Sequence, residues 1–265
     1  MGDATGLRTA QHIAFESFGA RIRVTADTPE VLERIPALLP PGSTPCSPDD
    51  VDESFGILAD VGGTYRFTRE DSPVTKGDLG LAMMLLENQV RISVGLHAPG
   101  MIFIHAGVVG HRGKAIVIPG LSFAGKTTLV LALVRAGATY YSDEFAVLDQ
   151  AGRVHPYAKP LSIRDHDQVQ SDHEVERFGG AAGDEPVDIG VVAFTEYRAN
   201  AEWDPQPISP GQGALKLLAN TLAARARSAE ALPAIRRAIA GAVLLDGPRG
   251  EAERVVDRLI KAVPA

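Results

Sequence analysis

The segment GLSFAGKT at residues 120–127 constrains the fold of this chain more than any other feature of the sequence. It fits the pattern G-x-x-x-x-G-K-[ST] in full; the apolar run AIVI precedes it and the amphipathic run TTLVLALVRAG follows it. Glycines let the backbone curl so that successive N–H groups point at phosphate oxygens, and the amino end of a following helix adds positive potential. The sequence therefore predicts a strand, a phosphate-binding turn and a helix, in that order.

This motif assigns a role to each of its positions. Lys126 is expected to reach the β- and γ-phosphates of a nucleotide, and the Thr127 hydroxyl to ligate Mg²⁺. A glycine turn with only a structural role is the alternative. The residues expected to contact the nucleotide are Gly120, Leu121, Ser122, Phe123, Ala124, Gly125, Lys126, Thr127 and Thr128.

Two adjacent carboxylates, Asp143 and Glu144, follow the strand-like run ATYYS soon after the predicted helix. A carboxylate at the end of a neighbouring strand can hold a metal ion or accept a proton from an attacking hydroxyl. Strand alternation predicts that the two side chains point apart. The alternative is an acidic strand end that faces water. The short spacing after the helix favours a kinase or carboxykinase over a motor protein or a GTPase.

His105 stands in the apolar run FIHAGVV, one strand before the glycine-rich turn. Considered alone, the apolar neighbours of His105 favour a histidine buried in the hydrophobic core. If the two strands pair, however, His105 lies beside the turn and near the transferred phosphate.

Residues 105–164 resemble the C-terminal catalytic domain of the bacterial HPr serine kinase/phosphorylases. Smaller HPr-kinase-related proteins are more similar still, because they also carry SDE after the helix and a stretch like HPYAKPLSIR. The turn itself also resembles that of phosphoenolpyruvate carboxykinase. The resemblance implies an α/β fold: a P-loop kinase core of the HPr-kinase/phosphoenolpyruvate-carboxykinase type.

The same resemblance implies ATP and Mg²⁺ as ligands and gives roles to several residues. Asp143 would be the base on the acceptor hydroxyl, Glu144 and Thr127 would hold the metal, and His105 would lie beside the active site. Arg164, in a stretch similar to the family's L-E-I-R, would neutralise charge that develops on the phosphoryl group.

The expected activity is transfer of the γ-phosphoryl group to a hydroxyl, on a serine of a small protein or peptide. Two departures from the family, Phe123 in the turn and Ser162 in place of a glutamate, motivate an alternative: a nucleotide-binding regulatory module without transfer activity. A small-molecule kinase is a third interpretation. HPr kinases form hexamers, so the resemblance also makes a homo-oligomer an expectation.

Apolar periodicity and turn residues predict two domains: an N-terminal α+β module over residues 1–99 with a connecting helix, and a P-loop kinase-like domain over residues 100–265. Helices are expected at residues 29–39, 76–96, 126–136, 213–226, 231–241 and 250–263. Strands are expected within residues 12–26 and at residues 54–60, 64–69, 101–109, 114–120, 187–197 and 242–247. Residues 138–149 are expected to form a strand with an acidic interruption. A long polar loop or weak helix is expected at residues 166–186.

Charge and composition exclude some partners. The formal net charge of −7 argues against nucleic acid, which requires a clustered basic face. No stretch approaches the length of apolar sequence needed to cross a bilayer, so no membrane association is expected. The single cysteine, Cys46, and the absence of an apolar leader predict a protein of the reducing cytoplasm.

Overall fold

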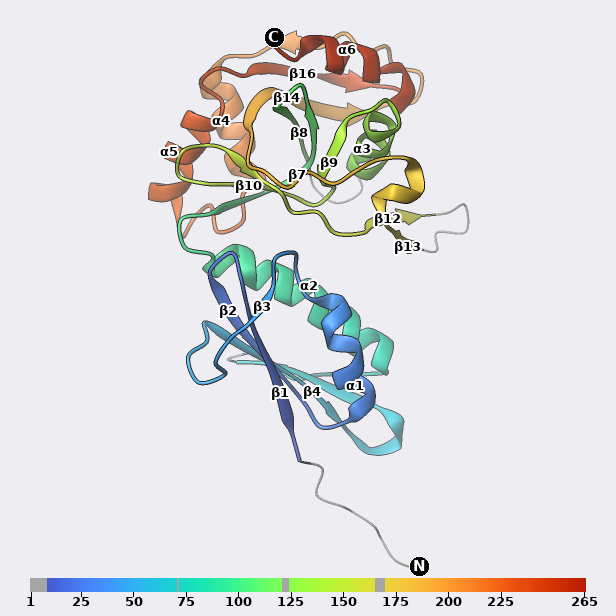
Figure 1. Ribbon diagram of the computed structural model, residues 1–265, viewed down its shortest axis with the longest axis vertical. Coiled ribbons are helices and arrows are strands. Elements are labelled where there is room, and N and C mark those ends of the chain that lie inside the picture. Colours follow the sequence, from blue (N-terminus) through green and yellow to red (C-terminus); the bar gives the residue numbers. More distant parts are fainter. Residues whose placement is uncertain (1–8, 71, 121–123, 165–169) are drawn as a thin grey trace, which may run out of the picture. The chain divides into compact units, whose positions relative to one another are not determined.

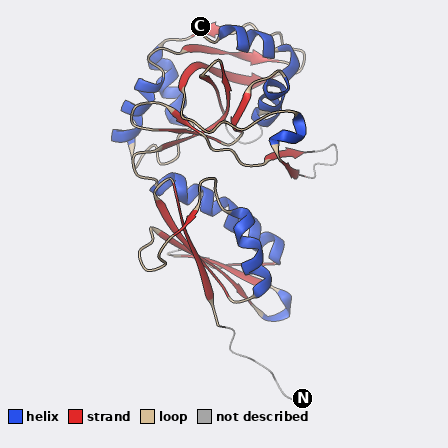
Figure 2. Ribbon diagram, viewed as in Figure 1, coloured by secondary structure: helices blue, strands red, loops and turns tan. Residues whose placement is uncertain are grey.

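The computed structural model describes residues 9–70, 72–120, 124–164 and 170–265. The chain divides into two compact units, Met1–Pro99 and Gly100–Ala265. Helices and strands alternate through both units, which confirms a mixed α/β fold (Figure 2). Of the helices within the described residues, none combines the length and the apolar character needed to cross a bilayer.

The first unit is one mixed sheet with helices packed against it (Figure 1). Its strands are β1 (Gln11–Ser17), β2 (Ala20–Ala26), β3 (Thr44–Pro45), β4 (Glu53–Ala59), β5 (Tyr65–Arg69) and β6 (Thr75–Gly77), in the spatial order β3-β1-β2-β4-β5-β6. Its helices are α1 (Pro29–Arg34), the 3-10 helices η1 (Ile35–Leu38) and η2 (Val61–Gly63), and α2 (Leu79–His97).

Alternation of side chains along β2 explains which face of this sheet is buried. Every second residue of β2, from Ala20 to Ala26, is fully buried, and the residues between them are partly exposed. Helix α2 packs against β2, β4 and β5. It begins where the Asp78 carboxylate accepts the Leu81 N–H at 2.8 Å, so the helix starts later than the sequence pattern predicts.

The second unit has a larger sheet. Its strands are β7 (Ile102–His111), β8 (Lys114–Pro119), β9 (Thr139–Ser142), β10 (Phe145–Leu148), β11 (Val154–His155), β14 (Asp188–Tyr197), β15 (Gln206–Pro207) and β16 (Val243–Arg249). The spatial order is β11-β10-β7-β8-β14-β16-β15, and β9 also pairs with β7. Strands β8, β14 and β16 are mutually parallel, whereas β7 is antiparallel to β8, β9 and β10.

Helices cover both faces of this sheet (Figure 1). On one face lie α3 (Lys126–Arg135), α6 (Val256–Ala262) and the 3-10 helix η4 (Ala252–Arg254); on the other lie α4 (Pro210–Ala219) and α5 (Ser228–Ala238). Alternate residues of β8 serve the two faces: Ile116 and Ile118 pack toward α3, and Ala115 and Val117 toward α4 and α5. A separate hairpin, β12 (Leu161–Arg164) with β13 (Gln170–His173), precedes the 3-10 helix η3 (Val175–Phe178).

Several element boundaries differ from the sequence-based prediction, each for a local reason. The expected strand over 138–149 is two strands, β9 and β10, separated by a bend at Asp143 and Glu144. Helix α4 starts earlier because Ser209 and Gln212 form a capping box. The predicted closing helix over 250–263 is divided into η4 and α6. The predicted loop over 166–186 contains β13 and η3, and residues 165–169 lie outside the described part of the chain.

Candidate phosphate-binding site

The turn between β8 and α3 requires glycine at its last position. Gly125, the N-cap of α3, has φ +74°, in the left-handed region that glycine tolerates best. A Cβ atom at Gly125 would also lie 2.5 Å from Nη2 of Arg249. At the first position, the Gly120 N–H donates to the His105 carbonyl at 3.1 Å, which ties the turn to β7. Leu121, Ser122 and Phe123 lie outside the described residues, so their contacts stay predictions.

Thr127, in the first turn of α3, meets the carboxylate that follows β9. The Thr127 hydroxyl donates to Oδ2 of Asp143 at 2.9 Å. Oδ1 of Asp143 lies 3.1 Å from the Tyr140 hydroxyl, whose oxygen is also 3.0 Å from the Lys159 carbonyl. Burial, reinforced by Asp143, raises the pKa of Tyr140, so the phenol keeps its proton and remains a donor. With 3% of its side chain exposed, Asp143 is held in one orientation.

Both adjacent carboxylates reach one ammonium group. Nζ of Lys159 lies 3.4 Å from Oδ1 of Asp143 and 3.7 Å from Oε2 of Glu144. The two side chains were expected to point apart, but the backbone bends here because the Ser142 hydroxyl accepts the N–H groups of Glu144 and Phe145 at 3.0 and 2.9 Å. The Glu144 side chain is 23% exposed, so it is the more accessible carboxylate.

Two further predicted residues, Lys126 and His105, are electrostatic neighbours. Burial lowers the pKa of Lys126, while Asp143 and Glu144 oppose that shift. Burial also lowers the pKa of His105, and the charge of Lys126 lowers it further. The His105 ring lies 4.8 Å from the ring of Phe145, its partner across the β7–β10 ladder. A neutral imidazole is therefore favoured at this position.

Arg249, the last residue of β16, is a site residue that sequence reasoning missed. It is 2% exposed; Nη2 donates to the Gly125 carbonyl at 2.8 Å and Nη1 to the Gly250 carbonyl at 3.0 Å. Within the described part of the chain its Nε has no hydrogen-bond partner, and the carboxylates of Glu251 and Glu253 are the acidic groups that attract its charge. A buried cation thus supports the glycine-rich turn. No motif marks Arg249 in the sequence, because VLLDGPR resembles any strand that ends in a surface arginine.

The structure brings four of the predicted residues together: Lys126, Thr127, Asp143 and Glu144, with His105 next to them. Thr128 is exposed in the first turn of α3 and Ala124 is half-buried before it. The backbone of Arg164 lies in β12, but its side chain is outside the described part, so its role stays a prediction. Lys159 is 13% exposed and paired with both carboxylates.

The donor set fits a magnesium ion. A hydroxyl and a carboxylate oxygen 2.9 Å apart are hard oxygen ligands, and Mg²⁺ in phosphate sites typically takes one or two protein oxygens beside those of the substrate and water. Among the described residues there is no cluster of three or more His, Cys, Asp and Glu side chains of the kind that builds an all-protein metal site.

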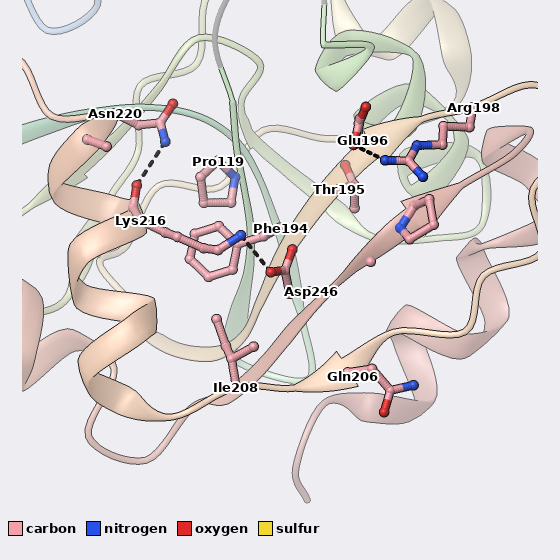
Figure 3. A pocket seen from close by; sticks show the side chains of 13 residues that line it. Pro119, Phe194, Thr195, Glu196, Arg198, Gln206, Ile208, Lys216, Asn220 and Asp246 are labelled. Carbon is pink, nitrogen blue, oxygen red and sulfur yellow. Dashed lines mark hydrogen bonds and ion pairs between the residues drawn. The ribbon is translucent and has the colours of Figure 1, made fainter.

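A pocket of about 660 Å³ opens at the carboxyl ends of the parallel strands (Figure 3). It begins at Pro119, the last residue of β8, and extends between α4 and the ends of β14 and β16. Its lining combines apolar surface with polar and charged side chains, which are Thr195, Glu196, Arg198, Gln206, Lys216, Asn220 and Asp246. No pattern in the sequence indicates this pocket, because its lining comes from distant segments.

No protein-family model matches the chain, and neither does any curated protein. A function can therefore be inferred only from the chain's own residues.

Proposed function

We propose that this chain is an ATP-dependent kinase that transfers the γ-phosphoryl group to a hydroxyl, with a serine of a small protein or peptide as the acceptor. The observation that carries the proposal is the 2.9 Å contact between the Thr127 hydroxyl and the Asp143 carboxylate. It joins the first turn of α3, after a glycine-rich turn, to a buried carboxylate in the bend between β9 and β10. Triphosphate binding requires these parts together.

The backbone at the start of α3 and the ammonium of Lys126 would hold the phosphates, since both present positive charge to them. Thr127 and Asp143 would hold Mg²⁺ through their oxygens. When bound, Mg²⁺ neutralises charge on the β- and γ-phosphates. Arg249 and Gly125 keep the turn in shape, because the carbonyl of Gly125 accepts from both the guanidinium and the Leu129 N–H.

The contacts favour an exchange of the two carboxylate roles that the resemblance implies. Asp143 is buried and already bonded to Thr127, which suits a metal ligand, whereas Glu144 is accessible to an acceptor. In this assignment the acceptor O–H gives its proton to the Glu144 carboxylate. The acceptor oxygen then bonds to the γ-phosphorus while the bond to the bridging oxygen breaks, and ADP leaves. Neutral His105 would remain a hydrogen-bonding neighbour of the transferred group.

The test is nucleotide binding and turnover by the full chain with ATP and Mg²⁺. Wild-type protein should bind ATP by calorimetry and form ADP slowly with water as acceptor. Thr127→Val, which preserves shape and removes the hydroxyl, should lower the ADP rate by at least about 100-fold while the protein stays folded at the assay temperature. Tight binding with no ADP formation would favour the regulatory module over the kinase. Absence of ATP binding by folded protein would refute both.

A further inference from the structure

The residues that line the pocket beside Pro119 do not include Asp143 or Glu144, and most of them lie on other strands of the sheet. Along the sheet, β9 and β10, which flank Asp143 and Glu144, pair with β7, on one side of β8. The pocket lies mainly at the ends of β14 and β16, on the other side of β8, and its Asn220 end reaches β7, where the Asn220 carbonyl accepts the His105 N–H at 2.8 Å. The phosphate-binding turn follows β8 and is thus between the two.

In phosphoryl transfer, the attacking and leaving oxygens lie roughly in line on opposite sides of phosphorus. The acceptor approaches from the side of the carboxylate that takes its proton. The rest of the nucleotide then extends away from the carboxylates, which is the direction of the pocket. Carboxyl ends of parallel strands are also where ligands bind in open α/β sheets.

The charge balance of the pocket suits the uncharged end of a nucleotide. Its cations are already paired: Lys216 Nζ lies 2.6 Å from Oδ2 of Asp246, and Nη2 of Arg198 lies 2.9 Å from Oε2 of Glu196. The buried cation Arg249 lies instead beside the glycine-rich turn, where its Nη2 donates to the Gly125 carbonyl. Phosphates are therefore attracted to the turn, and the pocket offers them no net charge.

The polar groups of the pocket are held in place before a ligand arrives. The Lys216 ammonium lies 5.3 Å over the Phe194 ring while it pairs with Asp246, and the Asn220 side chain donates to the Lys216 carbonyl at 2.9 Å (Figure 3). Asp246 offers carboxylate oxygens to hydroxyl groups, and the amides of Asn220 and Gln206 offer both donors and acceptors. A sugar and a heterocyclic base present the complementary groups.

We propose that this pocket binds the nucleoside part of the nucleotide, with Asp246 accepting from ribose hydroxyls and the two amides contacting the base. The inference rests on the proposed function, because it requires the phosphates to occupy the turn before α3. It adds a recognition site that the glycine-rich motif does not contain. It also makes Asp246 a specificity-determining residue.

Calorimetry on the full chain with two probes, Mg²⁺–ATP and Mg²⁺–tripolyphosphate, tests the inference. Tripolyphosphate has the phosphates and lacks the nucleoside. Wild-type protein should bind ATP at least about ten-fold more tightly than tripolyphosphate, since hydrogen bonds to a charged group are lost without the nucleoside. Asp246→Asn should remove most of that difference and leave the affinity for tripolyphosphate unchanged.

Asp257→Asn on α6, an exposed carboxylate outside the pocket, is the matched control and should change neither affinity. Equal affinity of wild-type protein for ATP and tripolyphosphate would overturn the inference and leave the proposed kinase intact. This comparison needs no variant, so it holds even if Asp246→Asn folds poorly. Failure of folded wild-type protein to bind either probe would instead overturn the proposed function, and the inference with it.

Discussion

In the first unit, the buried carboxylate of Glu53 contacts the Arg69 guanidinium and the Ser93 hydroxyl, with Nε2 of His97 3.5 Å away. In the second unit, the buried guanidinium of Arg249 donates only to main-chain carbonyls within the described residues. Removing one partner of a buried ion pair is strongly destabilising, so Glu53 and Arg69 are expected to depend on each other for stability. The comparison separates a buried charge that pairs with an opposite charge of its own unit from a buried charge that contacts the main chain of the glycine-rich turn.

Substitutions of the two buried acids, Asp143 and Glu53, give the largest expected effects and the strongest test of this comparison. Asp143→Asn keeps an oxygen for the Thr127 hydroxyl and removes the charge that holds Mg²⁺, so we expect ADP formation to fall by about 1,000-fold. Glu53→Gln should leave that rate unchanged and lower the free energy of unfolding by about 2 kcal/mol, because Arg69 loses its partner. Urea unfolding and a coupled ADP assay measure both. The reverse pattern would contradict the division of roles.

Two glycines with similar backbone angles, one in each unit, give the second test of the comparison. Gly62 has φ +71° and open space where a Cβ atom would lie, whereas Gly125 has φ +74° and Arg249 in the way. Gly62→Ala should cost about 1 kcal/mol of stability from backbone strain alone and leave ATP binding unaltered. Gly125→Ala should cost more and weaken ATP binding by about 100-fold, because the turn must move. Calorimetry that finds equal ATP affinity in the two variants would remove Gly125 from the site.

The two arginines give a smaller contrast. Arg249→Met removes a cation from beside the turn and a donor from the Gly125 and Gly250 carbonyls, so we expect ATP affinity to fall by about 30-fold, with a loss of about 1 kcal/mol in stability. Arg69→Met leaves the carboxylate of Glu53 without its guanidinium partner, so we expect a loss of about 2 kcal/mol in stability and no change in affinity. If Arg249→Met unfolds the protein and Arg69→Met does not, the arginine of the second unit is structural.

The smallest expected effect is on the pH dependence of the free energy of unfolding. Folding lowers the pKa of His105, chiefly by burial, below its ordinary value of 6.5. At a pH between the folded and the unfolded pKa of His105, the unfolded chain binds more protons than the folded chain. The free energy of unfolding therefore falls as the pH drops from about 6.5 through the folded pKa. His105→Gln lacks this titration and should lose less stability than wild type between about pH 7 and pH 5. Identical losses in urea titrations of the two proteins would show that His105 does not titrate in this way.

Sequence patterns predicted the parts of the site that are close along the chain and missed the parts that only the sheet brings together. Periodicity located α3 and the strand before it, and the motif identified Lys126 and Thr127. The bend at Asp143 was not predicted, because it depends on the Ser142 hydroxyl accepting two N–H groups. Arg249 and Asp246 were missed because their distance from the turn is set by the parallel pairing of β14 with β8 and β16.

A crystal structure of the full chain with a non-hydrolysable ATP analogue and Mg²⁺ tests the central claim most directly. We expect the β-phosphate to accept hydrogen bonds from the N–H groups at the start of α3, and the metal to be bound by the oxygens of Thr127 and Asp143. A nucleotide bound elsewhere, with the Thr127 hydroxyl still donating to Asp143 and no metal between them, would contradict it.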